Sequence, residues 1–232
     1  MRNGGEKILN VLVACEESQM VCKAFREKGH SAYSNDIVKC SGGHPEWHIL
    51  DNALSVLNGG LCRLQNGERI DIDHWDLIIA HPPCTYLSNV AVRHHSLKSN
   101  SENRIEGRTI QRINGMRFFM DCIMANCDKI AVENPVGVMN TAFRKPDQII
   151  EPYQFAAGLD DTENYVTKRT CLWLKNLQQL KTNNLPKPDN AKIWGRLSKG
   201  KARNWCDSST HSAKIRSKTF PGVAKAMADQ WR

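Results

Sequence analysis

The stretch WDLIIAHPPC, from Trp75 to Cys84, decides how the rest of the chain is interpreted. Its first six residues form an apolar run with the length and composition of a buried strand. Two prolines follow and stiffen the backbone just past the end of that strand. They present Cys84 at the edge of the expected sheet. A thiol held in this way is either an ordinary loop cysteine or a nucleophile.

Strands and helices alternate along the remainder of the chain. The expected strands are Ile8–Cys15, Ser31–Asn35, Ile49–Leu50, Trp75–Ala80, Lys129–Val132 and Thr170–Leu174. The expected helices are Gln19–Lys28, which Ser18 is predicted to cap, Ala53–Leu61, Arg108–Ala125 and Val223–Trp231. This alternation predicts an α/β fold with a doubly wound, mostly parallel sheet.

The composition is that of an ordinary globular protein with a single domain over residues 1–232. Of these residues 41% are hydrophobic and 24% are charged. No apolar run approaches the roughly 20 residues of a membrane helix, and the N-terminus lacks the features of a signal peptide. We therefore expect a cytoplasmic protein. Nine scattered cysteines without a CxxC spacing favour neither a disulfide framework nor a zinc ribbon.

The net charge of +8 is concentrated in two segments. Lys175–Lys218 carries a net +9 and Arg93–Arg117 carries +4, which leaves −5 for the rest of the chain. Such patches favour a polyanionic partner, with nucleic acid first, although two solvated loops are the alternative. Residues 176–215 also hold few apolar side chains, so we predict an irregular, basic excursion from the sheet instead of a second domain.

Several chemically useful side chains follow the expected strands. Asp36 and Asp51 stand where a carboxylate can accept both ribose hydroxyls of a nucleoside-like cofactor. Cys84 and Glu133 should lie on the same rim of the sheet, where a thiolate could attack a pyrimidine and a carboxyl group could hold its polar edge. The basic stretch that begins at Arg93 is expected to lower the pKa of the thiol.

These segments resemble the motifs of cytosine-5 DNA methyltransferases, in a compact form found among phage and prophage proteins. HPPC resembles the Pro-Cys catalytic motif, AVENP the Glu-Asn-Val motif, and YVTKRTCLWL the Gln-x-Arg-x-Arg motif with Arg169 at the first arginine. LVACEESQMVCKAFREKGHSAYSNDI resembles the opening cofactor segment, ILD the third cofactor motif, and TFPGVAKAMADQW the closing helix. The resemblance covers most of the chain except residues 176–215, where a large target-recognition domain is missing.

The resemblance implies a Rossmann-like fold of the S-adenosylmethionine-dependent methyltransferase type and methyl transfer to C5 of cytosine in DNA. The implied catalytic residues are Cys84, Glu133 and Arg169. The implied cofactor-binding residues are Ala14, Cys15, Glu16, Glu17, Ser18, Asp36, Ile37, Asp51 and Pro82. The implied substrate contacts are Ser88, Arg93, Asn134 and Lys168. The cofactor is S-adenosyl-L-methionine, the partner is double-stranded DNA with the target base flipped out, and no metal or membrane is involved. The resemblance further implies a monomer or weak dimer, encoded by a phage or prophage and active in the bacterial cytoplasm in restriction and modification.

Two departures from the family motifs are visible, and three other functions remain open. Ala14-Cys15-Glu16-Glu17 stand in place of Phe-x-Gly-x-Gly, and Cys171 stands at the second arginine of Gln-x-Arg-x-Arg. The chain could instead be an amino-methyltransferase acting on cytosine N4 or adenine N6, although Cys84 opposes this. It could act on RNA or a free nucleotide, or be a non-catalytic DNA-binding module.

A zinc site is a further, less favoured alternative. Cys40, His44 and His48 have the residue types of zinc ligands, but the glycines and proline between them exclude a regular helix that would align them.

Overall fold

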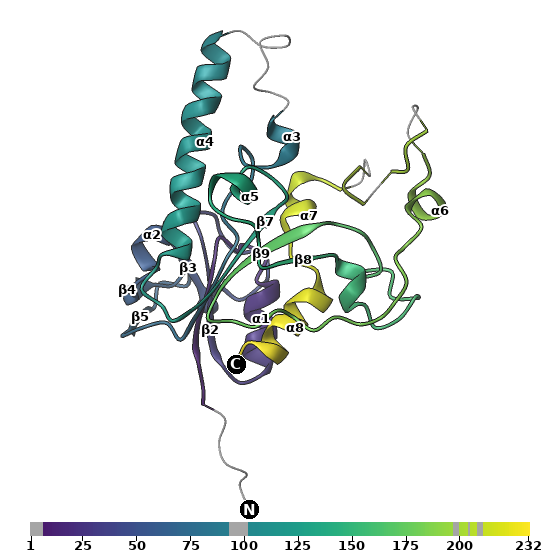
Figure 1. Cartoon of the computed structure of the whole chain (residues 1–232). Coiled ribbons are helices and arrows are strands. Elements are labelled where there is room, and N and C mark those ends of the chain that lie inside the picture. The colour runs from purple at the N-terminus through teal and green to yellow at the C-terminus, as the bar shows by residue number, and fades with distance from the viewer. Residues whose placement is uncertain (1–6, 93–101, 197–199, 204, 208–210) are drawn as a thin grey trace, which may run out of the picture.

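A seven-stranded sheet forms the centre of the structure, a computed structural model that describes residues 7–92, 102–196, 200–203, 205–207 and 211–232 (Figure 1). The strands lie in the order β3-β2-β1-β6-β7-β9-β8. They are β1 (Asn10–Ala14), β2 (Ser31–Asp36), β3 (His48–Leu50), β6 (Leu77–Ala80), β7 (Lys129–Pro135), β8 (Gln148–Ile150) and β9 (Thr170–Lys175). The first five strands of that order are parallel, and β9 is antiparallel to both of its neighbours. The prediction of an α/β, mostly parallel sheet is confirmed, whereas β8 was not predicted.

The sheet reverses its winding direction between β1 and β6. From β1 the chain moves outward through β2 to β3, and it later places β6 and β7 on the other side of β1. In open α/β sheets, ligands bind at the carboxyl ends of the strands beside such a switch point. The strand register aligns Ala80 with Ala14 on one side and with Val132 on the other. The next residues, His81 and Glu133, therefore emerge side by side at this edge.

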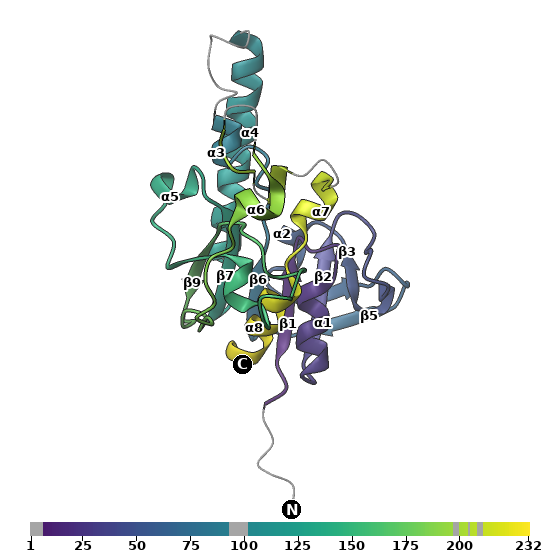
Figure 2. The same ribbon diagram turned by 90° about the vertical axis from the view of Figure 1, so that its right-hand side faces the viewer.

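Helices cover both faces of the sheet. The helices α1 (Met20–Glu27) and α8 (Pro221–Gln230) pack together on one face, and α2 (Ala53–Val56) and α4 (Glu102–Ile123) lie on the other. The short helices are α3 (Asn89–Val92), α5 (Met139–Ala142), α6 (Asn190–Trp194) and α7 (Ala213–Ser217). Figure 2 shows that α4 extends well beyond the sheet. Of the helices in the described residues, none has the length and apolar character needed to cross a membrane.

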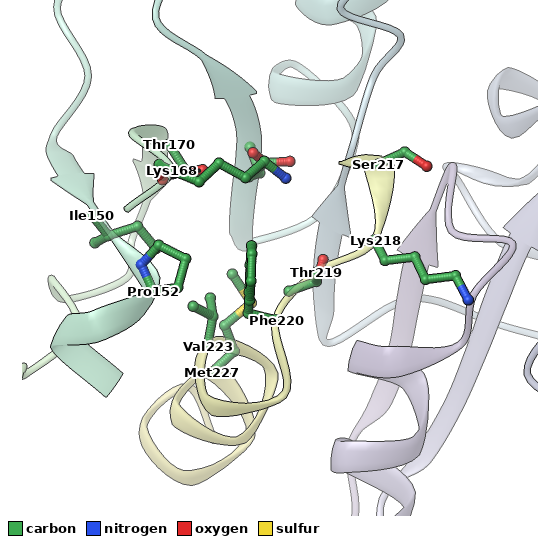
Figure 3. A pocket seen from close by; sticks show the side chains of 11 residues that line it. Ile150, Pro152, Lys168, Thr170, Ser217, Lys218, Thr219, Phe220, Val223 and Met227 are labelled. Atoms are coloured by element: carbon green, nitrogen blue, oxygen red, sulfur yellow. Dashed lines mark hydrogen bonds between the residues drawn. The ribbon is translucent and has the colours of Figure 1, made fainter. Parts of the chain in front are cut away.

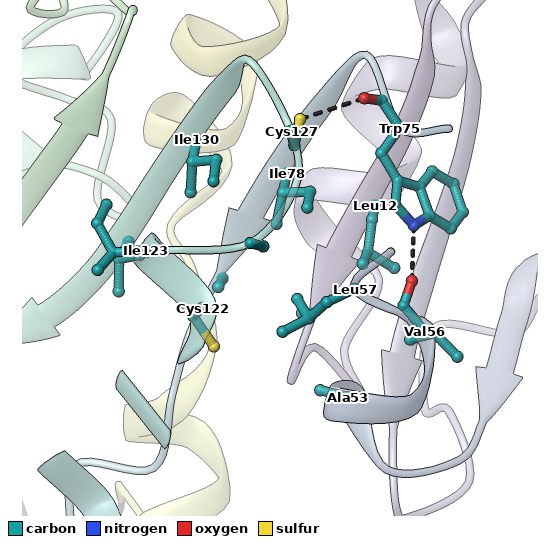
Figure 4. Packing of buried hydrophobic residues seen from close by; sticks show 14 of the residues in the cluster. Leu12, Ala53, Val56, Leu57, Trp75, Ile78, Cys122, Ile123, Cys127 and Ile130 are labelled. Carbon is teal, nitrogen blue, oxygen red and sulfur yellow. Dashed lines mark hydrogen bonds between the residues drawn. The ribbon is translucent and has the colours of Figure 1, made fainter. Parts of the chain in front are cut away.

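Alternation along the strands divides the core into two layers. In β1, Leu12 faces α2 and α4, whereas Val11 and Val13 face α1 and α8. Figure 4 shows the first of these layers, in which the indole N–H of Trp75 donates to the carbonyl of Val56 at 2.7 Å. All three β1 side chains are fully buried, as expected for a parallel strand that is covered on both faces.

Two predicted helix boundaries are wrong. The helix expected over Ala53–Leu61 ends at Val56, because Gly59 and Gly60 adopt left-handed φ angles of 79° and 90°. The chain then forms a small antiparallel hairpin of β4 (Gly60–Arg63) and β5 (Arg69–Ile72). The helix expected from Arg108 begins earlier, at the first residue of α4.

The amino-terminal cap of α1 also differs from the prediction. Ser18 does not cap the helix, and Gln19 at its start adopts a left-handed φ of 60°. The carboxylate of Glu16 instead accepts hydrogen bonds from the backbone N–H groups of Val21 at 2.6 Å and Cys22 at 3.2 Å. A negative charge at this position is favoured by the helix dipole.

The basic excursion over residues 176–215 has an irregular course wherever the structure describes it, with only short helical turns. Trp205 packs against His211 and Phe220, with ring centroids 4.3 and 5.0 Å apart, and Trp194 lies 5.9 Å from His211. The two tryptophans therefore belong to a small aromatic core that joins the excursion to the start of α8.

Candidate active site at the carboxyl edge of the sheet

Cys84 lies in the turn that directly follows β6, residues 81–88, which we call the HPPC turn. The backbone carbonyl of Cys84 accepts hydrogen bonds from the N–H groups of Leu87 and Ser88, both at 3.0 Å. The residue itself is exposed, so the turn presents the thiol to solvent. Ser88 is half-buried beside it and bridges to Gly137 in the segment after β7. Arg93, the other substrate contact predicted near this turn, lies outside the described residues.

The electrostatic environment of the Cys84 thiol differs from the prediction. Although the residue is exposed at the surface, packing on the inner side of the sulfur raises its pKa above the ordinary value, and the negative charge of Glu133 raises it further. Lys168 acts in the opposite direction but does not reverse the shift. The expected lowering of the thiol pKa is therefore wrong for the protein alone, and Cys84 is a protonated thiol at neutral pH.

Glu133 lies on the neighbouring strand β7 and contacts His81. The Nδ1 atom of the histidine donates to Oε2 of the carboxylate at 3.1 Å. Burial raises the pKa of Glu133, but the hydrogen bond and charge of His81, together with Lys168, outweigh burial and hold the pKa below its usual value. Glu133 is therefore an ionised carboxylate. The second ring nitrogen of His81, Nε2, is buried and has no hydrogen-bond partner among the described residues.

Two contacts fasten the HPPC turn to β7 and the segment after it. Asn134 is only 2% exposed, and its side-chain amide donates to the backbone carbonyl of Pro82 at 2.8 Å. The N–H of Val138 donates to the carbonyl of Leu87 at 2.8 Å, and Gly137 approaches that carbonyl so closely that any Cβ would overlap it. Asn134 and Pro82, predicted as a substrate contact and a cofactor contact, are thus engaged with each other and position the turn.

Lys168 is directed into the site, whereas Arg169 is not. The Nζ atom of Lys168 donates to the backbone carbonyl of Arg216 at 2.7 Å and lies 5.6 Å from the ring centroid of Phe220. In Figure 3, Lys168 extends across a hollow above Phe220. Arg169 is exposed next to the first residue of β9 and lines neither of the two hollows found at this edge. Its predicted catalytic role has no contact in the described residues to support it.

Two hollows open at the carboxyl edge of the sheet. The Glu133 hollow, lined also by Lys168 and Phe220, has an empty volume of about 340 Å³, and the Glu17 hollow, which follows β1, has about 380 Å³. Residues 217–219 line both hollows and form the wall between them. Figure 3 shows Lys218 of this wall pointing away from Phe220, toward the amino-terminal strands.

The Glu17 hollow contains most of the residues predicted to bind a cofactor. Its lining includes Cys15, Glu16, Glu17, Ser18, Asp36 and His81, while Ala14 is buried directly before them. Burial raises the pKa of Glu16 to about 7, even though His81 and the N–H groups of α1 act to lower it. Both carboxylate oxygens of Glu17 are buried without a hydrogen-bond partner among the described residues, and the Nζ atom of Lys214 lies 3.8 Å from one of them. The hollow therefore offers acceptors and negative charge to a ligand.

Asp36 and Asp51 lie next to each other, because β2 and β3 pair in parallel. The backbone N–H of Asp51 donates to the carbonyl of Asp36 at 3.2 Å. Asp36 lines the Glu17 hollow, and Ile37 beside it leaves 75% of its surface exposed. Asp51 is exposed, does not line the hollow, and accepts a hydrogen bond from the N–H of Asn52 at 2.6 Å.

The two histidines considered for zinc are otherwise engaged. His48 is buried, and its two ring nitrogens lie 2.9 Å from the hydroxyl of Ser34 and 2.9 Å from the carbonyl of Val38. His44 stacks on Trp47 with ring centroids 3.7 Å apart. In the part of the chain that the structure describes, no group of three or more His, Cys, Asp or Glu side chains is arranged to hold a metal.

Sequence reasoning missed two parts of this site. His81 lies immediately before the two prolines, so its place at the edge of the sheet was available as a signal, but its contact with Glu133 joins residues 52 positions apart. The wall over residues 217–219 lies between the basic excursion and α8; Thr219 begins the segment that resembles the closing helix, whereas Ser217 and Lys218 have no local signature.

Comparison with known proteins adds no family assignment, because the chain matches no protein-family model and no curated protein. This edge of the sheet brings together a presented thiol, an ionised carboxylate paired with an imidazole, and an acidic hollow, all beside one switch point.

Proposed function

We propose that this protein transfers a methyl group from S-adenosyl-L-methionine to C5 of cytosine in double-stranded DNA, through a covalent bond between Cys84 and C6 of the base. The observation that carries the proposal is the position of Cys84 and Glu133 beside the switch point, where the Asn134–Pro82 hydrogen bond fastens one to the other. A nucleophile and a carboxylate on one rim are the two groups that attack on a pyrimidine ring requires. The seven-stranded sheet with helices on both faces is compatible with the methyltransferase type of Rossmann-like fold.

The Glu17 hollow suits the chemistry of S-adenosylmethionine. This cofactor carries an ammonium group, a sulfonium and two ribose hydroxyls, so its site must supply acceptors and negative charge. Among the described residues, the two buried carboxylate oxygens of Glu17 accept no hydrogen bond there and have only the more distant ammonium of Lys214 nearby, and Asp36 lines the same hollow. Ile37 adds an exposed apolar surface for the adenine. Cys15 adopts a left-handed φ of 60°, a conformation that usually favours glycine, in the loop where the family motif has glycines. When bound, the cofactor supplies an electrophilic methyl group.

Glu133 and His81 account for the proton movements in this proposal. The pair takes the proton of the Cys84 thiol, whose raised pKa keeps it protonated until the base arrives. The thiolate forms a bond to C6, the electrons of the C5–C6 double bond move into the ring, and N3 receives the proton held by the pair. With S-adenosyl-L-methionine bound, C5 would gain the methyl group as the methyl–sulfonium bond breaks, and would then lose its proton to water. The C6–S bond breaks, the double bond re-forms, and the N3 proton returns to the pair.

The test measures transfer of tritiated methyl from S-adenosylmethionine to duplex DNA, followed by digestion to nucleosides. We expect the label in 5-methylcytosine, at least 10³-fold less of it with Cys84→Ser because the attacking sulfur is lost, and an unchanged amount with Cys40→Ser. Cys40 is a suitable control because it is half-buried and lies outside both hollows. Label in an N-methylated base, or activity that survives Cys84→Ser, would overturn the Cys84 mechanism in favour of an amino-methyltransferase. Label on RNA or a free nucleotide alone would overturn DNA as the substrate.

A further inference from the structure

The projecting helix α4 carries a row of arginines on one side. Arg104, Arg108 and Arg112 are spaced four residues apart, so their side chains lie above one another along one face of the helix. The acidic residues of the same segment, Glu102 and Glu106, lie at helical positions more than 100° away from Arg108, since each residue turns about 100° around the axis. Among the described residues of α4, the charged side chains on this face are therefore all basic.

Two of these arginines contact the HPPC turn directly. The guanidinium of Arg108 lies over the ring of Tyr86, with its central carbon 5.2 Å from the ring centroid. The Nε atom of Arg112 donates to the backbone carbonyl of Tyr86 at 3.3 Å. Tyr86 is two residues after Cys84, so both cations are anchored to the turn that presents the thiol.

The two guanidinium groups are close enough to repel each other. Burial lowers the pKa of Arg112, and the charge of Arg108 lowers it further. The Nε atom of Arg108 is buried and has no hydrogen-bond partner among the residues that the structure describes. An anion bound between two neighbouring cations would offset their repulsion and accept the hydrogen bond that the Arg108 Nε–H can donate. Phosphate is a suitable anion, because the fork of N–H groups on a guanidinium matches its oxygen atoms.

We propose that Arg108 and Arg112 form a phosphate-binding site for the nucleic-acid backbone, at the phosphodiester next to the nucleotide whose base reaches Cys84. The inference rests on the proposed function for the identity of the base and on the arginine geometry for the phosphate. Arg104, four residues and about 6 Å further out along the helix axis, extends the row along the projecting part of α4, which a nucleic-acid strand passing over the HPPC turn would follow. The site assigns a polynucleotide as the partner, because a free nucleotide carries no flanking phosphodiester.

The experiment compares binding of a fluorescein-labelled 20-base-pair duplex to the full chain between about 50 and 200 mM NaCl, the range over which phosphate contacts dominate salt dependence. The test protein is the double variant Arg108→Gln, Arg112→Gln. Arg117→Gln is the matched control, because it removes the same charge from an exposed position of the same helix about 180° from Arg108. Each lost phosphate contact flattens the slope of log affinity against log salt by about 0.9.

We expect the double variant to bind at least 10-fold more weakly at low salt, with a slope shallower by between about 1 and 2, while Arg117→Gln changes affinity less than about twofold. The double variant Arg108→Lys, Arg112→Lys keeps the charges and is expected to retain the wild-type slope, which separates phosphate binding from damage to the fold. Equal affinities of the glutamine double variant and the Arg117 control would overturn the site. The site would also be overturned if the wild-type protein bound no duplex, or if the double variant lost affinity for single-stranded RNA but not for the duplex. Binding requires neither the cofactor nor Cys84, so failure of methyl transfer leaves this result independent.

Discussion

The Nδ1 atom of His81 lies 3.1 Å from Oε2 of Glu133, and this contact joins the ends of two adjacent parallel strands. The imidazole is almost fully buried, and it also faces Glu16 across the Glu17 hollow, where its charge lowers the pKa of that carboxyl. His81 is therefore placed between the hollow assigned to the cofactor and the carboxylate assigned to the base.

Replacing His81 by phenylalanine is expected to lower kcat of methyl transfer about 10²-fold, because the pair can no longer hold the transferred proton. Loss of the hydrogen bond and charge also raises the pKa of Glu133. The acid side of the pH–rate profile should therefore move to higher pH. His81→Gln retains a hydrogen-bond donor for Glu133, so its KM should equal that of the wild type, whereas its kcat should remain as low as that of His81→Phe. Full recovery of kcat by glutamine would show a purely structural role.

The pKa of Cys84 should respond in opposite directions to its two charged neighbours. Glu133→Gln removes a negative charge and should lower the thiol pKa, whereas Lys168→Met removes a positive charge and should raise it. The measurement is the rate of alkylation by iodoacetamide against pH, followed at the Cys84 peptide by mass spectrometry. In the wild type the rate should keep rising above pH 9.0, the ordinary value of the thiol. A rate that levels off below about pH 8 would contradict the environment described for the sulfur.

Gly137→Ala should displace the HPPC turn, because the added Cβ overlaps the backbone carbonyl of Leu87. Overpacking of this kind costs roughly 1–3 kcal/mol of unfolding free energy, and methyl transfer should fall with it. Gly107→Ala is the matched control, since it lies within α4 with nothing within 4 Å of the new Cβ. It should stabilise the protein by about 0.5–1 kcal/mol. Urea denaturation of both variants tests the contrast, and equal effects would exclude a tight contact at residue 137.

Glu16 should make the protein less stable as the pH rises. Burial raises the pKa of Glu16 from 4.5 to about 7, so the folded protein binds this proton more tightly than the unfolded chain does. The free energy of unfolding therefore falls between pH 4.5 and about 7 and stays lower above it, by on the order of 3 kcal/mol. Glu16→Gln keeps an oxygen that can cap α1 and removes the titration.

The check is the difference in melting temperature between Glu16→Gln and the wild type at several pH values. This difference should grow in favour of the variant from about pH 5 to about pH 8. A difference that does not change with pH would show that the Glu16 carboxyl titrates at its usual value in the folded protein.

The sequence was sufficient to predict the central strands but not the edges of the sheet. In β1 every residue from Val11 to Ala14 is fully buried, so its apolar run is a local signal. The three-residue strand β8 exists only because β9 pairs with it, and its Ile149 is 40% exposed. The helix cap was mistaken for a related reason: Ser18 has the usual residue type, but the left-handed backbone of Gln19 gives the cap to Glu16.

The strand-end residues Cys84 and Glu133 of the candidate site were predictable, whereas its electrostatics and the role of His81 were not. Cys84 and Glu133 each follow an apolar run, so their shared rim could be inferred from strand ends alone. The direction of the thiol pKa depends on how closely Glu133 and the surrounding atoms pack, which joins positions far apart in the chain. For the same reason Asn134 looked like a substrate contact, although its amide is occupied by Pro82.

Because the wall over residues 217–219 lies near the carboxyl end of the chain, the site is completed only when synthesis is nearly finished. Cys84 in the HPPC turn and Glu133 in β7 lie within the first 135 residues, yet both hollows lack a side until the segment leading into α8 has joined them. During synthesis, the ribosome would still hold that segment while the sheet is already able to form. A nascent chain, or one cut before residue 217, would expose the thiol without enclosing either ligand. Both hollows are thus enclosed only after the last segment of the chain has folded against the sheet.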